Sequence, residues 1–68
     1  MEISYNKLWK VLIDKNMKKI DLKGLAGISS SSLAKLGKNE PVTLEVLMKI
    51  CEALDVNISD IVEFIKKV

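Results

Sequence analysis

Apolar residues recur along this chain at spacings of three and four, the periodicity of helices with one buried face. In the first such stretch Tyr5, Leu8 and Leu12 share a face, and lysines occupy the opposite one. Capping Ser and Thr residues, and Gly, Asn and Pro residues that end helices, divide the pattern into five helices. They are expected at residues 5–15, 18–26, 30–36, 44–54 and 60–67. No stretch alternates apolar and polar residues, so the pattern predicts an all-α fold without strands.

Each predicted helix carries a set of apolar residues that should face one shared core. These sets are Tyr5, Leu8, Trp9, Leu12 and Ile13; Ile20, Leu22, Leu25 and Ala26; Leu33 and Leu36; Leu44, Leu47, Ile50, Cys51 and Leu54; and Ile58, Ile61, Val62 and Ile65. A chain of 68 residues suffices for one such core, so residues 1–68 are expected to form a single domain.

The composition indicates the cellular compartment in which the protein is expected. No apolar run approaches the ~20 residues that span a bilayer, and the first residues do not resemble a secretory signal. The single cysteine, Cys51, cannot form an internal disulfide, which fits a reducing compartment. We therefore expect a cytoplasmic protein that does not bind membranes.

The segment 19–38 carries the clearest structural signal. Two short predicted helices are joined by Gly27, Ile28 and Ser29, and a link this short that contains Gly sets two helices at a steep angle. The apolar residues of both helices would hold that angle from inside. The helix at 30–36 would then present an outward face consisting of Ser30, Ser31, Ala34 and Lys35.

The sequence KIDLKGLAGISSSSLAKL, residues 19–36, resembles the helix-turn-helix of the phage-repressor and Cro type, also called XRE-like. The likeness rests on inward Leu22, turn residue Gly27, apolar Ile28, and inward Leu33 and Leu36. Residues 46–56 look like the fourth helix of that family and residues 58–61 like the start of its fifth, so the resemblance covers about residues 4–65. It implies a five-helix DNA-binding domain with the helix-turn-helix at about 19–38. The implied function is sequence-specific transcriptional regulation, commonly repression by covering a promoter, although activation is equally compatible.

The resemblance also implies which residues meet double-stranded DNA. The helix at 30–36 would enter the major groove, where Ser30, Ser31 and Lys35 would contact bases. Phosphates would be held by residues at the start of the preceding helix and at the two ends of this one. These residues are Lys18, Lys19, Ser29, Lys38 and Asn39. The family usually has Ala at position 23 and often Gln at 19, 30 and 31, so the base preference stays open.

Charge is distributed unevenly. Residues 1–38 contain eight lysines and three acidic residues, whereas residues 39–68 contain three lysines and six acidic residues. This asymmetry fits a first half that faces a polyanion. Lysines that coat solvated helix faces explain the same charge pattern. The serine run is explained equally well as the solvated start of a helix. A protein-interaction module of the same fold with little DNA affinity, such as an antitoxin-like partner or an anti-repressor, is the alternative, and the lack of arginine favours it.

The residue types argue against catalysis and against bound cofactors. The chain has no histidine and one cysteine, which leaves no ligand set for zinc. Ser31 and Lys35 stand one helical turn apart like a nucleophile and its base, but an exposed lysine with a pKa near ~10.4 is a poor base. We therefore expect a protein that is not an enzyme and that needs neither metal nor cofactor.

The last predicted helix has more apolar surface than one buried stripe requires. Phe64 and Val68 fall outside the stripe formed by the other apolar residues of that segment. They are therefore candidates for the interface of a homodimer. A frayed and partly exposed C-terminus is the alternative.

Overall fold

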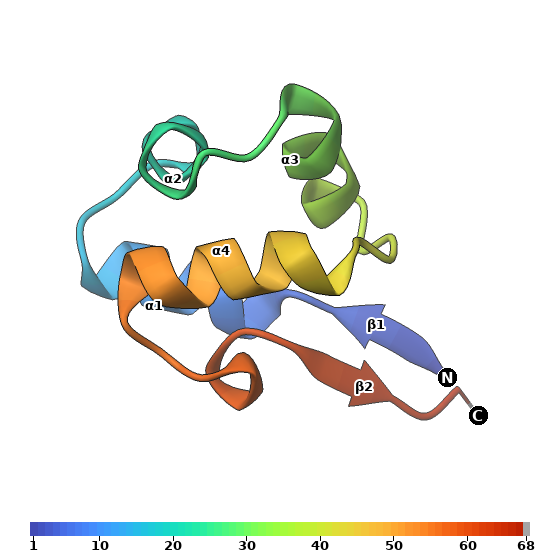
Figure 1. Ribbon diagram of the computed structural model, residues 1–68. Coiled ribbons are helices and arrows are strands. Elements are labelled where there is room, and N and C mark those ends of the chain that lie inside the picture. Colours follow the sequence, from blue (N-terminus) through green and yellow to red (C-terminus); the bar gives the residue numbers. More distant parts are fainter. Residues whose placement is uncertain (68) are drawn as a thin grey trace.

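Within residues 1–67, which the structure describes, a computed structural model shows four α-helices and a two-stranded sheet. The elements are β1 (Glu2–Ser4), α1 (Asn6–Asp14), α2 (Lys19–Ala26), α3 (Ser30–Gly37), α4 (Leu44–Leu54), the 3-10 turn η1 (Ile58–Asp60) and β2 (Glu63–Ile65). Figure 1 shows α2 and α3 on one side of α4 and the two strands on the other. The first four predicted helices are confirmed to within one residue at each end.

The expected fifth helix at 60–67 is wrong, and with it the expectation of a fold without strands. Residues 58–60 make a single 3-10 turn, and β2 then pairs antiparallel with β1. The register joins Glu2 to Ile65, Ile3 to Phe64 and Ser4 to Glu63. Branched and aromatic residues at 61–65 favour a strand, and the N-terminal segment supplies the partner. The fold is therefore mostly helical, with a small sheet that joins the two ends of the chain.

The core draws on every helix. Its buried apolar residues are Tyr5, Leu8, Leu12, Leu22, Ile28, Leu36, Leu47, Ile50, Leu54 and Ile61. The expected inward positions of Ile13, Ile20, Leu25 and Leu44 are wrong, because each of these side chains is more than half exposed. Short helices meet the core along a narrow stripe, and residues near their ends or beside the stripe remain in solvent. No helix in the described part of the chain is long and apolar enough to cross a membrane.

Candidate nucleic-acid interface

The turn between α2 and α3 depends on one glycine. Gly27 ends α2 in the left-handed conformation, with φ 68° and ψ 38°, and its amide donates to the carbonyl of Lys23 at 3.0 Å. Glycine adopts this conformation without the penalty that a Cβ atom brings. The next residue, Ile28, is buried, and Ser29 has extended backbone from which α3 begins. The bend therefore anchors the chain in the core immediately before the second helix.

Helix α3 rests on the core along one face and is exposed on the other. Leu36 is fully buried and Leu33 is partly buried against the core. The outward residues Ser30, Ser31, Ala34 and Lys35 are all exposed. The structure thus gathers the three expected base-contacting residues on one solvent-facing surface of a helix whose other side is fixed.

The serine run has a structural role at its first position. The hydroxyl of Ser29 accepts a hydrogen bond from the amide of Ser32 at 3.1 Å and lies 3.1 Å from the Ser32 hydroxyl. Ser29 is therefore the N-cap of α3, and its side chain is engaged within the protein. A phosphate contact from Ser29 stays a prediction.

The start of α2 carries two exposed lysines and one acid. The ammonium group of Lys19 lies 4.4 Å from the centre of the Trp9 ring, a cation–π contact that fixes the direction of this side chain. The amide of Lys18 donates to the Asp21 carboxylate at 2.9 Å, so Asp21 closes the first turn of α2. This carboxylate adds negative charge where phosphates were expected to bind.

The loop after α3 is tied to the beginning of α1 by contacts that sequence reasoning missed. The amide of Tyr5 donates to the Asn39 side-chain oxygen at 3.1 Å, and the Tyr5 hydroxyl donates to the carbonyl of Glu40 at 2.7 Å. Burial raises the pKa of the Tyr5 phenol, which therefore remains a neutral donor. Asn39 has a positive φ of 56°. Asparagine is enriched in this conformation, so the asparagine at position 39 was the signal in the sequence that indicated a turn there.

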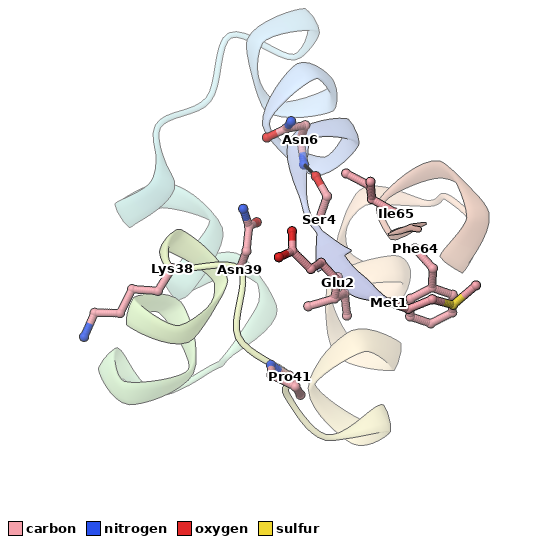
Figure 2. Close-up of a pocket in the computed structure, with 10 residues that line it drawn as sticks. Met1, Glu2, Ser4, Asn6, Lys38, Asn39, Pro41, Phe64 and Ile65 are labelled. Carbon is pink, nitrogen blue, oxygen red and sulfur yellow. Dashed lines mark hydrogen bonds between the residues drawn. The ribbon is translucent and has the colours of Figure 1, made fainter. Parts of the chain in front are cut away.

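Lys38 and Asn39, both expected to hold phosphates, point in different directions. Figure 2 shows the Lys38 side chain extending away from β1, and the Asn39 side chain in the space between the loop and the strand. The phosphate contact of Lys38 stays a prediction, with its ammonium group directed away from the strand (Figure 2). Asn39 uses its side-chain oxygen inside the protein, so its phosphate contact stays a prediction that relies on its amide nitrogen.

The one cysteine offers no competing chemistry. Cys51 is half-buried on α4, and burial, followed by the nearby charge of Asp60, raises the pKa of its thiol. The thiol therefore stays protonated at neutral pH, the unreactive form. No cluster of three potential metal ligands occurs among residues 1–67.

A short helix pair joined by a left-handed glycine turn, with an exposed second helix, defines a helix-turn-helix (HTH) DNA-binding protein. The sequence profile of the Cro/C1-type HTH DNA-binding domain matches residues 7–67, and the chain belongs to this family. The crystal structure of transcriptional regulator VanUg, form II, has 56% sequence identity with this chain and a TM-score of 0.89. The match covers 91% of this chain and 83% of that one. The comparison with curated proteins gave no match.

These findings confirm the resemblance to XRE-like regulators. They support a DNA-binding regulator as the class of protein.

Proposed function

We propose that this protein is a repressor that places α3 in the major groove of operator DNA and covers a promoter. The observation that carries this proposal is the outward face of α3, where Ser30, Ser31 and Ala34 are small and Lys35 is the one long side chain. A helix with such a face can approach the base edges closely, and the major groove is wide enough to admit it. The similarity to a structure described as a transcriptional regulator supports the same function.

The proposed contacts divide into two kinds. Ser30 and Ser31 can donate or accept hydrogen bonds and therefore discriminate weakly between bases, whereas Lys35 can reach guanine O6 and N7. The phosphate contacts would surround this helix and would fix the position of the protein on the DNA. The proposed phosphate-binding residues are Lys18, Lys19, Ser29, Lys38 and Asn39.

Selection of bound sequences from a random DNA pool, followed by binding measurements on the selected site, tests the proposal. With Lys35→Ala we expect a changed sequence preference, because this side chain is assigned to a base. With Lys38→Ala we expect about threefold to tenfold weaker binding of every sequence and a salt slope reduced by about 0.9, since one phosphate contact is lost. If both variants lost the same affinity for every DNA sequence, the assigned roles would be contradicted.

One observation favours the protein-interaction module as a second function. Asp21 places a carboxylate in the first turn of α2, next to the proposed phosphate contacts, and the chain has no arginine. Mobility shift at two salt concentrations separates the two functions. The affinity of a DNA-binding protein should fall steeply as the salt concentration rises. The absence of any retarded DNA band at low salt would favour the interaction module.

The contact between Lys19 and Trp9 supplies an internal signal for DNA binding. Trp9 is the only tryptophan of the chain, and its ring faces the Lys19 ammonium group. A phosphate that draws this ammonium group away would change the emission of Trp9. We expect this change during titration of wild-type protein with DNA, and a much smaller one for Lys19→Gln. Lys19→Gln should also lower the free energy of unfolding by about 0.5 kcal/mol, the value of an exposed cation–π contact.

Lys10→Gln is the matched control for this titration, because Lys10 is an exposed lysine next to Trp9 in the sequence. It should retain the full emission change. An unaltered response in Lys19→Gln would show that Lys19 does not move when DNA binds.

We further propose that the repressor acts as a homodimer on a two-fold symmetric operator. Two copies of α3 would then enter successive major grooves about 34 Å apart. Two half-sites raise both affinity and specificity over a single weakly discriminating helix.

A further inference from the structure

An apolar groove runs along one face of α4 and ends at η1. Its volume is about 340 Å³, and it is lined by Leu44, Leu47, Met48, Cys51, Glu52 and Ile58. Leu47 is buried and Cys51 is half-buried, so both form the floor. Leu44, Met48 and Ile58 form the walls, and they are 64%, 63% and 46% exposed. Exposed apolar side chains that gather in one place mark a surface to which another molecule binds.

The path of the chain after α4 leaves this groove uncovered. A fifth helix at 60–67 was expected to close the core. Instead η1 makes a single turn, and the chain continues to β1, where it forms β2 (Figure 1). Within residues 1–67, Leu44 and Met48 therefore remain in solvent beside η1.

The groove is separate from the other candidate surfaces of the molecule. Phe64, which the sequence suggested for a dimer, is 66% exposed on β2 and does not line the groove. Val68, suggested with it, lies outside the described residues. The outward residues of α3 do not line the groove either. An inference about the groove therefore does not rest on the proposed repressor function.

The charges around the groove are mostly acidic. The segment from α4 to η1 contains four acidic residues and one lysine. Glu52 lines the groove, Asp55 caps the end of α4, and Asp60 ends η1. The lysine, Lys49, has its ammonium group 3.6 Å from the Glu45 carboxylate, which offsets its charge. A ligand that complements this rim carries positive charge.

The construction of the groove favours a helix as its occupant. Its walls come from α4 and η1, and the backbone groups of an α-helix bond within the helix itself. An extended peptide would find few backbone partners there, whereas a helix satisfies its own backbone before it binds. α4 has 11 residues and is about 16 Å long, which matches a partner helix of about three turns.

We propose that this groove binds a basic amphipathic helix of a partner protein. Apolar residues at positions i, i+4 and i+7 of that helix enter the groove, and lysine or arginine residues beside them face Glu52, Asp55 and Asp60. The acidic rim disfavours DNA and anionic membranes as occupants. It also disfavours a two-fold contact between the grooves of two copies, because that contact brings like charges together.

Binding of a designed peptide tests the proposal. The probe is a fluorescently labelled peptide of Ala, Leu and Lys, with leucines at i, i+4, i+7 and i+11 and lysines on both sides of them. It has about 15 residues, the length at which such sequences become helical. Fluorescence anisotropy should give a micromolar dissociation constant, as suits a small interface. A scrambled peptide of the same composition should bind at least about tenfold more weakly, because its leucines no longer share a face.

Met48→Glu tests the apolar wall of the groove. The side chain is exposed, so the substitution leaves the core intact. We expect about tenfold weaker binding of the probe, the effect of one lost apolar contact. Ile13→Glu is the matched control, because Ile13 is 75% exposed on α1 and does not line the groove. It should bind the probe like the wild type.

Glu52→Lys tests the acidic rim. It should bind the lysine probe about fivefold more weakly, and it should bind a probe with glutamates in place of the lysines more tightly than the wild type does. Asp14→Lys makes the same change of charge at the exposed end of α1. It should leave the affinity for both probes unchanged.

Three results would overturn the proposal. The first is a wild type that does not bind the probe at about 1 mM, or that binds the scrambled peptide equally well. The second is equal binding of the probe by Met48→Glu and Ile13→Glu. The third is self-association of the wild type in analytical ultracentrifugation that Met48→Glu abolishes, since a second copy would then occupy the groove.

Mobility shift separates this inference from the proposed function. Met48→Glu should bind the selected DNA like the wild type, because Met48 lies outside the proposed DNA contacts. A wild type that binds the probe but no DNA would refute the repressor and leave the groove standing. A wild type that binds DNA but not the probe would refute the groove alone.

Discussion

Replacement of Leu36 by alanine is expected to lower the free energy of unfolding by about 3 kcal/mol. Leu36 is fully buried and is the last inward residue of α3 before the loop to α4. Its truncation leaves a cavity that a rigid, close-packed core fills only in part. Total stability is about 3–10 kcal/mol for a domain of this length, so the variant should retain about 0–7 kcal/mol and unfold at a markedly lower urea concentration than the wild type. Urea unfolding followed by circular dichroism measures the change.

Leu25→Ala is the matched control for this experiment. Leu25 also lies in an eight-residue helix, but its side chain is mostly exposed. Its loss should cost less than about 0.5 kcal/mol. If the two variants lost equal stability, α3 would not be held by the buried contact of Leu36. DNA binding of Leu36→Ala should fall with the folded fraction, because the position of the exposed face of α3 depends on the buried contact of Leu36.

The helix-turn-helix could be predicted from the sequence because its signals are local. Gly27 marks the end of α2, Ile28 marks the point where the chain enters the core, and Ser29 caps α3. Each acts within four residues, which is the range over which helix periodicity and capping operate. The outward residues of α3 follow from the inward ones, so the candidate face was predicted together with its helix.

The C-terminal segment could not be predicted in the same way. Residues 61–65 have an apolar pattern that fits a helix, and the residues that decide otherwise are at positions 2–4. Strand pairing between the two ends of a chain leaves no periodic signal in either segment alone. The contact of Tyr5 with the loop at Asn39 has the same character, because 34 residues separate its partners. Local reasoning predicts the four helices, but long-range contacts decide that the C-terminal segment is a strand and where the elements lie.

Asp21 shows how one residue can support the fold and oppose the function. Its carboxylate accepts the amide of Lys18 and so closes the first turn of α2, where a negative charge is favourable. The same charge repels phosphate. Lys18 and Lys19 stand beside it, and under the proposed phosphate contacts the balance between these three side chains would determine how strongly the start of α2 attracts DNA.

Ser31→Glu separates the stability of α3 from its binding to DNA. Ser31 is exposed at the second position of α3, where the N-terminal end of the helix dipole favours an acidic residue. We therefore expect an unchanged or slightly higher melting temperature. In the major groove the same carboxylate would face the electronegative edges of bases and nearby phosphates without a partner. DNA affinity should fall about 100-fold, the cost of one unpaired like charge at an interface.

Ser59→Glu makes the same chemical change at another exposed serine, in the turn η1. It should leave DNA affinity within about twofold, because a distant surface charge is screened by salt. Thermal melting and mobility shift of the two variants together give the test. A loss confined to Ser31→Glu, with folding intact, requires the N-terminal face of α3 to lie against DNA. Equal binding by both variants and the wild type would remove α3 from the groove, and the exposed serines would then be only the solvated start of a helix.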